Sequence, residues 1–142
     1  MSKLKPISFN KNEAQEVLLV IKDILNNSEC IKNNSLLDKF IKYIKRYKLD
    51  LIITSKNKII FSCGTKVNKY INYSISKNLR NCINEESLST MRSSRLEITD
   101  GNFINGLYYY LSIKNSDTNI GSIIWIYNDK NKDKAGELLL SF

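Results

Sequence analysis

The spacing of apolar residues predicts an amphipathic helix near the start of the chain. After Asn12, apolar positions recur at steps of three and four residues, which places them on one face of a helix that ends at residues 26–28. This face comprises Ala14, Val17, Leu18, Ile21, Ile24 and Leu25. Asn12 and Gln15 have the spacing of a capping box, so we expect Asn12 to be the N-cap.

A second amphipathic helix is predicted from Ser35 or Leu36 to about Lys48, with Ser35 and Asp38 at capping-box spacing. Its apolar face comprises Leu37, Phe40, Ile41 and Ile44, and its opposite face comprises Lys39, Lys42, Lys45 and Arg46. A basic face of this kind can follow phosphates or a membrane surface. It is also typical of the solvated side of an amphipathic helix, which is the interpretation we favour.

The middle of the chain has the pattern of a β-hairpin. Leu51–Thr54 and Lys58–Ser62 are rich in apolar and β-branched residues, and the polar residues 55–57 between them favour a turn. Gly64 follows the second strand, where we expect a positive φ or a close approach of the backbone.

The C-terminal half is predicted to contain a short helix, three strands and a last helix. The short helix runs from about Ser76 to Asn84, with Ser74 or Ser76 as its cap, and residues 85–94 form a loop. Strands are predicted at Arg95–Thr99, Leu107–Lys114 and Ile120–Tyr127, and the last two form an antiparallel hairpin. Asp129 is expected to cap the last helix.

The predicted order of elements is α-α-β-β-α-β-β-β-α. Because the strands follow one another without helical crossovers, we predict an α+β fold with a central, mostly antiparallel five-stranded sheet and helices packed on it. GAF- and PAS-like sensor folds share this layout, as do profilin- and roadblock-like interaction domains. We expect a single compact unit, in which residues 1–34 form an N-terminal lead and helix and residues 35–142 form the GAF-like domain.

Composition changes this prediction little. The 142 residues suit one domain, and the formal net charge of +8 comes from lysine far more than from arginine. A nucleic-acid interface would gather these charges on one face, whereas lysine is interleaved with aspartate and glutamate along the whole chain. Binding of nucleic acid through Lys39, Lys42, Lys45 and Arg46 is therefore our third hypothesis.

The chain offers few residues for catalysis or metal binding. There is no histidine and no CxxC motif, so the common zinc spacings are not met, and we predict neither a metal nor a cofactor. Cys63 precedes Gly64 at a strand end, but we interpret it as a small buried residue rather than a nucleophile. We predict that the protein is not an enzyme. No signal peptide or membrane span is recognised, so we expect a cytoplasmic location with reduced thiols.

The segment from Asp50 to Cys82 resembles the C-terminal, GAF-like domain of the stage V sporulation protein T family. The matching features are the strand LIIT, a polar turn, IIFSCG, the segment KVNKYINYSIS and a following helix. Residues 119–124, NIGSII, are similar to the closing strand of that family. The resemblance covers roughly residues 35–130. This chain begins with a helix instead of the AbrB-type DNA-binding domain of the family, so DNA binding is not carried over.

The resemblance implies a non-enzymatic regulatory or sensor domain that binds a small molecule or a protein partner, in a process related to sporulation. GAF-like domains place their pocket between the sheet and the helix and loop that follow the second strand. In this chain that region offers Tyr70, Tyr73, Arg92 and Arg95, together with Tyr108 or Tyr110 from the sheet. An arginine pair beside aromatic rings could bind a carboxylate or a phosphate. Alternatively, the arginines are loop charges and the tyrosines fill the core.

Association is the other hypothesis that the pattern supports. The first and last helices are more apolar than one small sheet requires, so we expect a homodimer formed through the terminal helices. A protein of this kind could be a ligand-free dimerisation domain similar to roadblock proteins. The alternative is that both helices simply cover the sheet of their own chain.

Overall fold

The computed structural model describes residues 7–27, 34–67, 70–85 and 95–142. Within these ranges the fold is α+β, as predicted. The helices are α1 (Lys11–Asn27), α2 (Ser35–Arg46), α3 (Lys77–Glu85) and α4 (Lys132–Ser141). The strands are β1 (Asp50–Ser55), β2 (Ile59–Cys63), β3 (Arg95–Thr99), β4 (Asn102–Asn105), β5 (Leu107–Asn115) and β6 (Thr118–Tyr127).

The strands form one four-stranded antiparallel sheet and a separate two-stranded hairpin. The order in the sheet is β2-β1-β6-β5, and β3 pairs only with β4. The prediction of a five-stranded sheet was therefore wrong. The observed order of elements also has one more strand than predicted, β4, between β3 and β5. The missed strand β4 is only four residues long and has asparagine at both ends, so it lacks the apolar alternation by which a strand is recognised.

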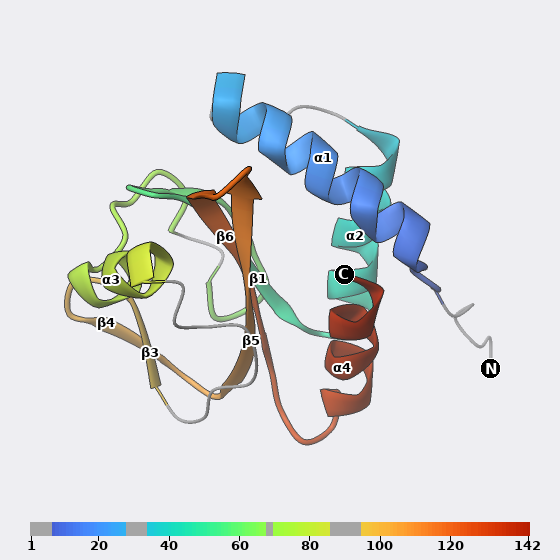
Figure 1. Ribbon diagram of the computed structural model, residues 1–142. Helices are drawn as coiled ribbons and strands as arrows, with labels where there is room; N and C mark the ends of the chain where they lie inside the picture. The colour runs from blue at the N-terminus through green and yellow to red at the C-terminus, as the bar shows by residue number, and fades with distance from the viewer. Residues whose placement is uncertain (1–6, 28–33, 68–69, 86–94) are drawn as a thin grey trace.

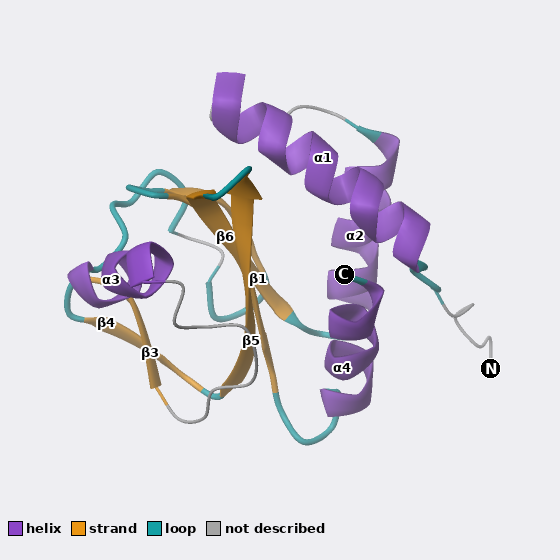
Figure 2. Ribbon diagram, in the orientation of Figure 1, coloured by secondary structure: helices purple, strands orange, loops and turns teal. Residues whose placement is uncertain are grey.

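The four-stranded sheet lies between two layers. Figures 1 and 2 show α1, α2 and α4 on one side of the sheet, and α3 with the β3–β4 hairpin on the other. Successive residues of the central strands therefore enter different cores: Leu51 and Ile53 pack with the three helices, and Ile52 packs with α3. Because both faces are covered, β1 is buried along its whole length. This explains why Leu51, Ile52 and Ile53 form a continuous apolar run instead of an alternating one.

The start of α2 at Ser35 is confirmed, but the caps of α1 and α2 lie one or two residues before the predicted ones. The capping box of α1 is Asn10 and Glu13, since Asn10 Oδ1 accepts from Glu13 N–H (2.9 Å) and Glu13 Oε1 accepts from Asn10 N–H (3.2 Å). In α2 the cap is Asn34, whose Oδ1 accepts from the N–H groups of Leu36 and Leu37. Several asparagine and serine residues precede each helix, and all of them can cap, so sequence spacing did not select among them.

The predicted cap is confirmed for α3 and is wrong for α4. Ser76 caps α3 as predicted, because its Oγ accepts from the N–H of Leu79 at 2.9 Å. Asp129 is not the cap of α4, which begins after Asn131. The Asn131 side chain is turned back instead, and its Oδ1 accepts from the N–H of Asn128 at 2.7 Å.

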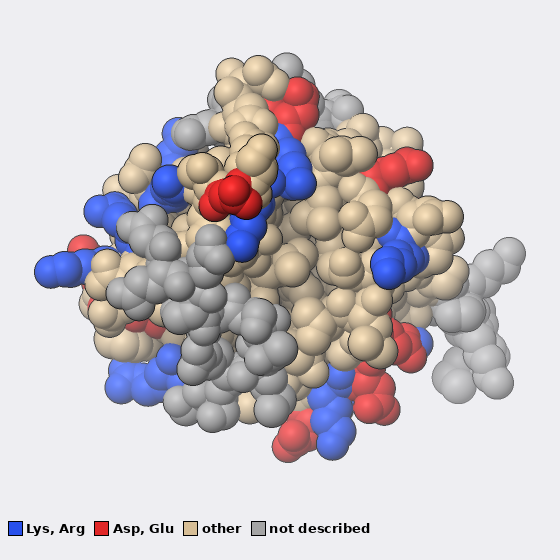
Figure 3. All heavy atoms as spheres, viewed as in Figure 1, with Lys and Arg blue, Asp and Glu red and all other residues tan. Residues whose placement is uncertain are grey.

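Charged residues of both signs are mixed on the surface. On the face shown in Figure 3, basic and acidic side chains are interspersed, and in places they lie beside each other. Lys39 of the basic helix face forms an ion pair with Glu13 of α1, so this lysine serves the contact between two helices. Among the described helices, none is long and apolar enough to cross a membrane.

Two glycines provide a test of the sheet. A Cβ on Gly121 would lie 2.1 Å from the carbonyl oxygen of Thr54, near the end of the β1–β6 pair where Gly121 is opposite Ser55, whereas a Cβ on Gly136 of α4 would meet nothing closer than 3.7 Å. We predict that Gly121→Ala lowers the free energy of unfolding by about 3 kcal/mol, because the strands must separate. Gly136→Ala should raise it by up to about 1 kcal/mol through helix propensity. Urea denaturation measures the free energy of unfolding of both variants. Equal changes in the two variants would contradict the register of β1 with β6.

Candidate functional site

The end of α2 places a lysine in an unusual backbone conformation. The N–H of Leu49 donates to the carbonyl of Ile44 (2.9 Å), and the N–H of Lys48 donates to that of Lys45 (3.2 Å). This pair of hydrogen bonds defines a Schellman motif, in which the residue after the C-cap adopts the left-handed conformation. That residue is Lys48, with a φ of 56°. Glycine is the usual residue at this position, and an L-residue costs roughly 1–2 kcal/mol there.

The surrounding structure holds Lys48 in place. Leu49 and Ile44, the apolar pair that accompanies a Schellman motif, both belong to the core under the helices. The Asn131 side chain donates to the carbonyls of Tyr47 (3.0 Å) and Lys48 (3.1 Å), so the loop before α4 braces the end of α2. Backbone strain that is held in this way is often found at functional sites.

The chain leaves β2 through a close contact with β1. Gly64 has a φ of 123°, and a Cβ at this position would lie 2.1 Å from Oδ1 of Asp50. The expected positive φ and close approach at Gly64 are thus confirmed. The same Oδ1 accepts from the backbone N–H of Lys66 at 2.9 Å. Asp50 therefore fixes the turn that carries Lys66 past the first residue of β1.

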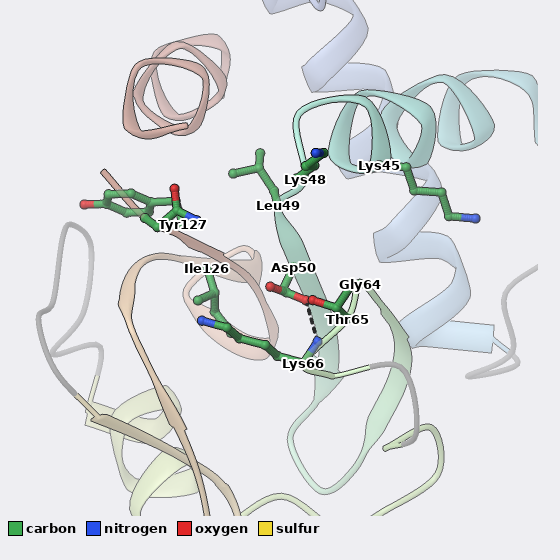
Figure 4. Close-up of a pocket in the computed structure, with 10 residues that line it drawn as sticks. Lys45, Lys48, Leu49, Asp50, Gly64, Thr65, Lys66, Ile126 and Tyr127 are labelled. Carbon is green, nitrogen blue, oxygen red and sulfur yellow. Dashed lines mark hydrogen bonds between the residues drawn. The ribbon is translucent and has the colours of Figure 1, made fainter. Parts of the chain in front are cut away.

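A pocket of about 570 Å³ opens between these elements, and we call it the lysine pocket. Its lining residues come from the end of α2, the start of β1, the turn after β2 and the end of β6 (Figure 4). They are Lys45, Lys48, Leu49, Asp50, Gly64, Thr65, Lys66, Ile126, Tyr127 and Asn128. Three lysines thus accompany one carboxylate, which gives the lining a net positive charge.

The lysines differ in how they face the pocket. Figure 4 shows the Nζ of Lys45 directed away from Asp50, while Lys48 lies beside Leu49 and Lys66 lies beneath Ile126. Lys66 Nζ donates to the carbonyl oxygen of Asn105 at 3.2 Å. Further basic residues line the hollows next to the pocket, namely Lys42, Arg46, Lys130 and Lys134. The region around the end of α2 is therefore suited to an anionic group.

The predicted site residues lie on the other face of the sheet and in several places. Tyr70 and Tyr73 make an edge-on ring contact (5.7 Å between centroids), with Tyr70 buried and Tyr73 exposed. Arg95 lies over the ring of Phe103, 4.1 Å from its centroid. Arg92 lies outside the described residues.

The remaining predicted residues, Tyr108 and Tyr110, are buried in the core that packs on α3. Burial raises the pKa of Tyr110 to about 12. Its hydroxyl and that of Ser112 have no hydrogen-bond partner among the described residues. Nearby on the same face, the hydroxyls of Thr54 and Ser122 lie 2.7 Å apart across the β1–β6 pair. In the described part of the chain, the two tyrosines from the sheet therefore contribute to packing.

Sequence reasoning missed the lysine pocket, although it named two of its residues. Gly64 was recognised as a special backbone position, and Lys45 as part of the basic helix face. Lys48 escaped notice because a left-handed helix end is normally signalled by glycine or asparagine, and lysine gives no such signal. Asp50 was noted only as the first residue of the segment that resembles the sporulation family, and the strand was predicted to start at Leu51.

The described residues offer neither an activated cysteine nor a cluster of metal ligands. Cys63 is buried, and burial raises the pKa of its thiol to about 11, which is the opposite of an activated thiolate. The described residues contain no cluster of three or more cysteine, aspartate or glutamate side chains that could hold a metal ion.

Comparisons with known proteins do not add a relative. No protein-family model matches the chain, and no curated protein matches it either. The resemblance to stage V sporulation protein T rests on the sequence features given above.

The strain at Lys48 can be measured directly. We predict that Lys48→Gly raises the free energy of unfolding by about 0.5–1 kcal/mol, because relief of about 1–2 kcal/mol of strain exceeds the added entropy of the unfolded chain, about 0.4–1 kcal/mol. Lys45→Gly removes the same charge from the last turn of α2, where the backbone is still helical, and should lower stability by up to about 1 kcal/mol. Chemical denaturation measures both variants. A loss of stability in Lys48→Gly would contradict the left-handed conformation.

The thiol of Cys63 gives a second test. Its folded pKa of about 11 lies above the ordinary value of 9, so the folded state holds the proton more tightly. We therefore predict no alkylation of Cys63 at pH 8 in the native protein and rapid alkylation in denaturant, followed by mass spectrometry. The stability that this proton provides is present below about pH 9 and is lost between about pH 9 and 11. Rapid native labelling at pH 8 would reveal a reactive thiol.

Proposed function

We propose that this protein is a non-enzymatic, GAF-like regulatory domain that binds a small anionic molecule in the lysine pocket. The observation behind the proposal is Lys48, a cationic residue kept at a backbone position where glycine would be more stable, on the rim of a pocket. The resemblance to the sporulation family supports the regulatory role. A sheet with β1 and β6 at its centre is compatible with the GAF-like fold.

Electrostatics favours an anion over a neutral ligand. A hydrogen bond from an ammonium group to a carboxylate or phosphate contributes about 1.5–3 kcal/mol, roughly twice as much as a neutral one. Lys48 and Lys66 approach the pocket from different elements, so one small anion can meet both. Such a pair corresponds to micromolar to millimolar affinity, which is suited to a metabolite sensor.

Catalysis is not part of the proposal. The sequence lacks histidine, the commonest general base, and burial keeps the Cys63 thiol protonated. The hydroxyl groups in the pocket lining are those of Thr65 and Tyr127, and the sequence has no histidine to activate them. Binding is therefore the chemistry that these side chains support.

The binding proposal is tested with a panel of small anions. Inorganic phosphate and simple mono- and dicarboxylates are titrated into the full chain by calorimetry, with thermal unfolding as a second readout. We expect at least one to bind and Lys48→Gln or Lys66→Gln to weaken it about tenfold, or 1.4 kcal/mol. Lys56→Gln removes the same charge from the β1–β2 turn and should bind as the wild type does. An equal loss in all three variants would indicate nonspecific attraction and contradict the assignment.

A ligand-free dimerisation domain is the second candidate, and two exposed leucines favour it. Leu19 of α1 is 64% exposed and Leu140 of α4 is 83% exposed, both on the terminal helices. Light scattering of the wild type and of Leu140→Asp decides this candidate. A dimer that the substitution dissociates supports it, and a monomeric wild type excludes it.

A further inference from the structure

The lysine pocket has two electrostatic poles. Its cationic groups belong to the exposed residues Lys48 and Lys66, whereas its carboxylate belongs to Asp50, which is only 5% exposed. A small anion alone would use the first pole and make no contact with the second. A ligand that satisfies both poles must carry a cationic as well as an anionic group.

The hydrogen bonds of Asp50 are incomplete in the described structure. Oδ1 accepts from Lys66 N–H, and Figure 4 shows the second carboxylate oxygen turned away from that contact. Among the described residues, no lysine or arginine forms an ion pair with Asp50. A buried carboxylate normally has a cationic or multiple hydrogen-bonding partner, because its desolvation is costly. Its second oxygen is thus an acceptor available to a ligand.

The neighbouring lysine is directed elsewhere. The backbone N–H of Lys66 donates to Asp50, whereas the Nζ of its side chain donates to the carbonyl oxygen of Asn105. Lysine side chains are long and rotate readily, so Lys48 and Lys66 can meet an anionic group near the pocket mouth. The ammonium groups of these two lysines therefore do not pair with the Asp50 carboxylate in this structure.

We propose that the ligand is a small zwitterion, specifically a free α-amino acid. Its ammonium group donates to the second oxygen of Asp50, and its carboxylate accepts from Lys48 and Lys66. Leu49, Ile126 and Tyr127 line the same pocket and provide apolar surface for its side chain. This inference rests on the proposed function, since it names the ligand class of the same pocket.

A purely structural role for Asp50 makes a different prediction. In that case Oδ1 holds the turn at Lys66, and the negative charge is incidental. Asp50→Asn distinguishes the two roles, because an amide oxygen can still accept from Lys66 N–H while the charge is removed. A structural role leaves ligand preference unchanged in this variant, whereas ammonium recognition does not.

The test compares amino acids with the same molecules lacking the amine. L-alanine, L-leucine and L-phenylalanine are titrated into the full chain beside propionate, 4-methylpentanoate and 3-phenylpropionate. We expect at least one amino acid to bind tenfold or more tightly than its matched carboxylate. Asp50→Asn should abolish this preference, with Lys56→Gln as the charge-loss control. Thermal unfolding checks that each variant is folded. If Asp50→Asn does not fold, the comparison of amino acids with carboxylates in the wild type still tests the proposal.

The outcomes separate this inference from the proposed function. If the carboxylates bind as tightly as the amino acids, and Lys48→Gln weakens them, the zwitterion assignment is wrong and anion binding stands. If the preference for amino acids persists in folded Asp50→Asn, the assignment of the ammonium to Asp50 is wrong. If neither series nor phosphate binds, both proposals fail.

Discussion

The pairing of β1 with β6 is the constraint on which the rest of the structure depends. These are the first and last strands along the chain, and they lie side by side in the sheet, from Asp50 opposite Ile126 to Ser55 opposite Gly121. One face of the pair supports α1, α2 and α4, and the other supports α3 and the β3–β4 hairpin. The approach at Gly121 leaves no room for a side chain, because a Cβ there would lie 2.1 Å from the carbonyl oxygen of Thr54 and 3.1 Å from a side-chain carbon of Leu25 in α1.

The same pairing decides where the lysine pocket lies. It brings Asp50 and Ile126 to one end of the sheet, where α2 ends in its Schellman motif and the chain leaves β2 at Gly64. The site is therefore built from three segments of the chain, at residues 45–50, 64–66 and 126–128. Loops and element ends supported by a rigid sheet are a common place for binding residues. The strained backbone at Lys48 is stable there because the core and Asn131 hold both of its sides.

The aromatic and arginine site predicted from the resemblance lies on the opposite face, and packing explains the difference. Along β5, Tyr108 and Tyr110 alternate with residues that face α1, α2 and α4. The residues of β6 that pair with these two tyrosines lie on the same face of the sheet, which packs on α3. Their rings enter a core instead of a cavity in the described structure. Arg95 is held over Phe103 by pairing of β3 with β4, a hairpin that the apolar pattern did not reveal.

Within the described residues, the sequence by itself determined the α+β class, the helices and five of the six strands, since apolar periodicity and turn residues are local signals. It also identified Ser76 as a cap and Gly64 as a special backbone position. Tertiary structure decided the partner of each strand, the asparagines that cap α1 and α2, and the meeting of Lys48, Asp50 and Lys66 in one pocket. The strand partners and the meeting of Lys66 with Asp50 depend on contacts between distant segments, for which the spacing of residues along the chain contains no measure. The caps are local contacts, and the sequence did not select among several neighbouring residues that can cap.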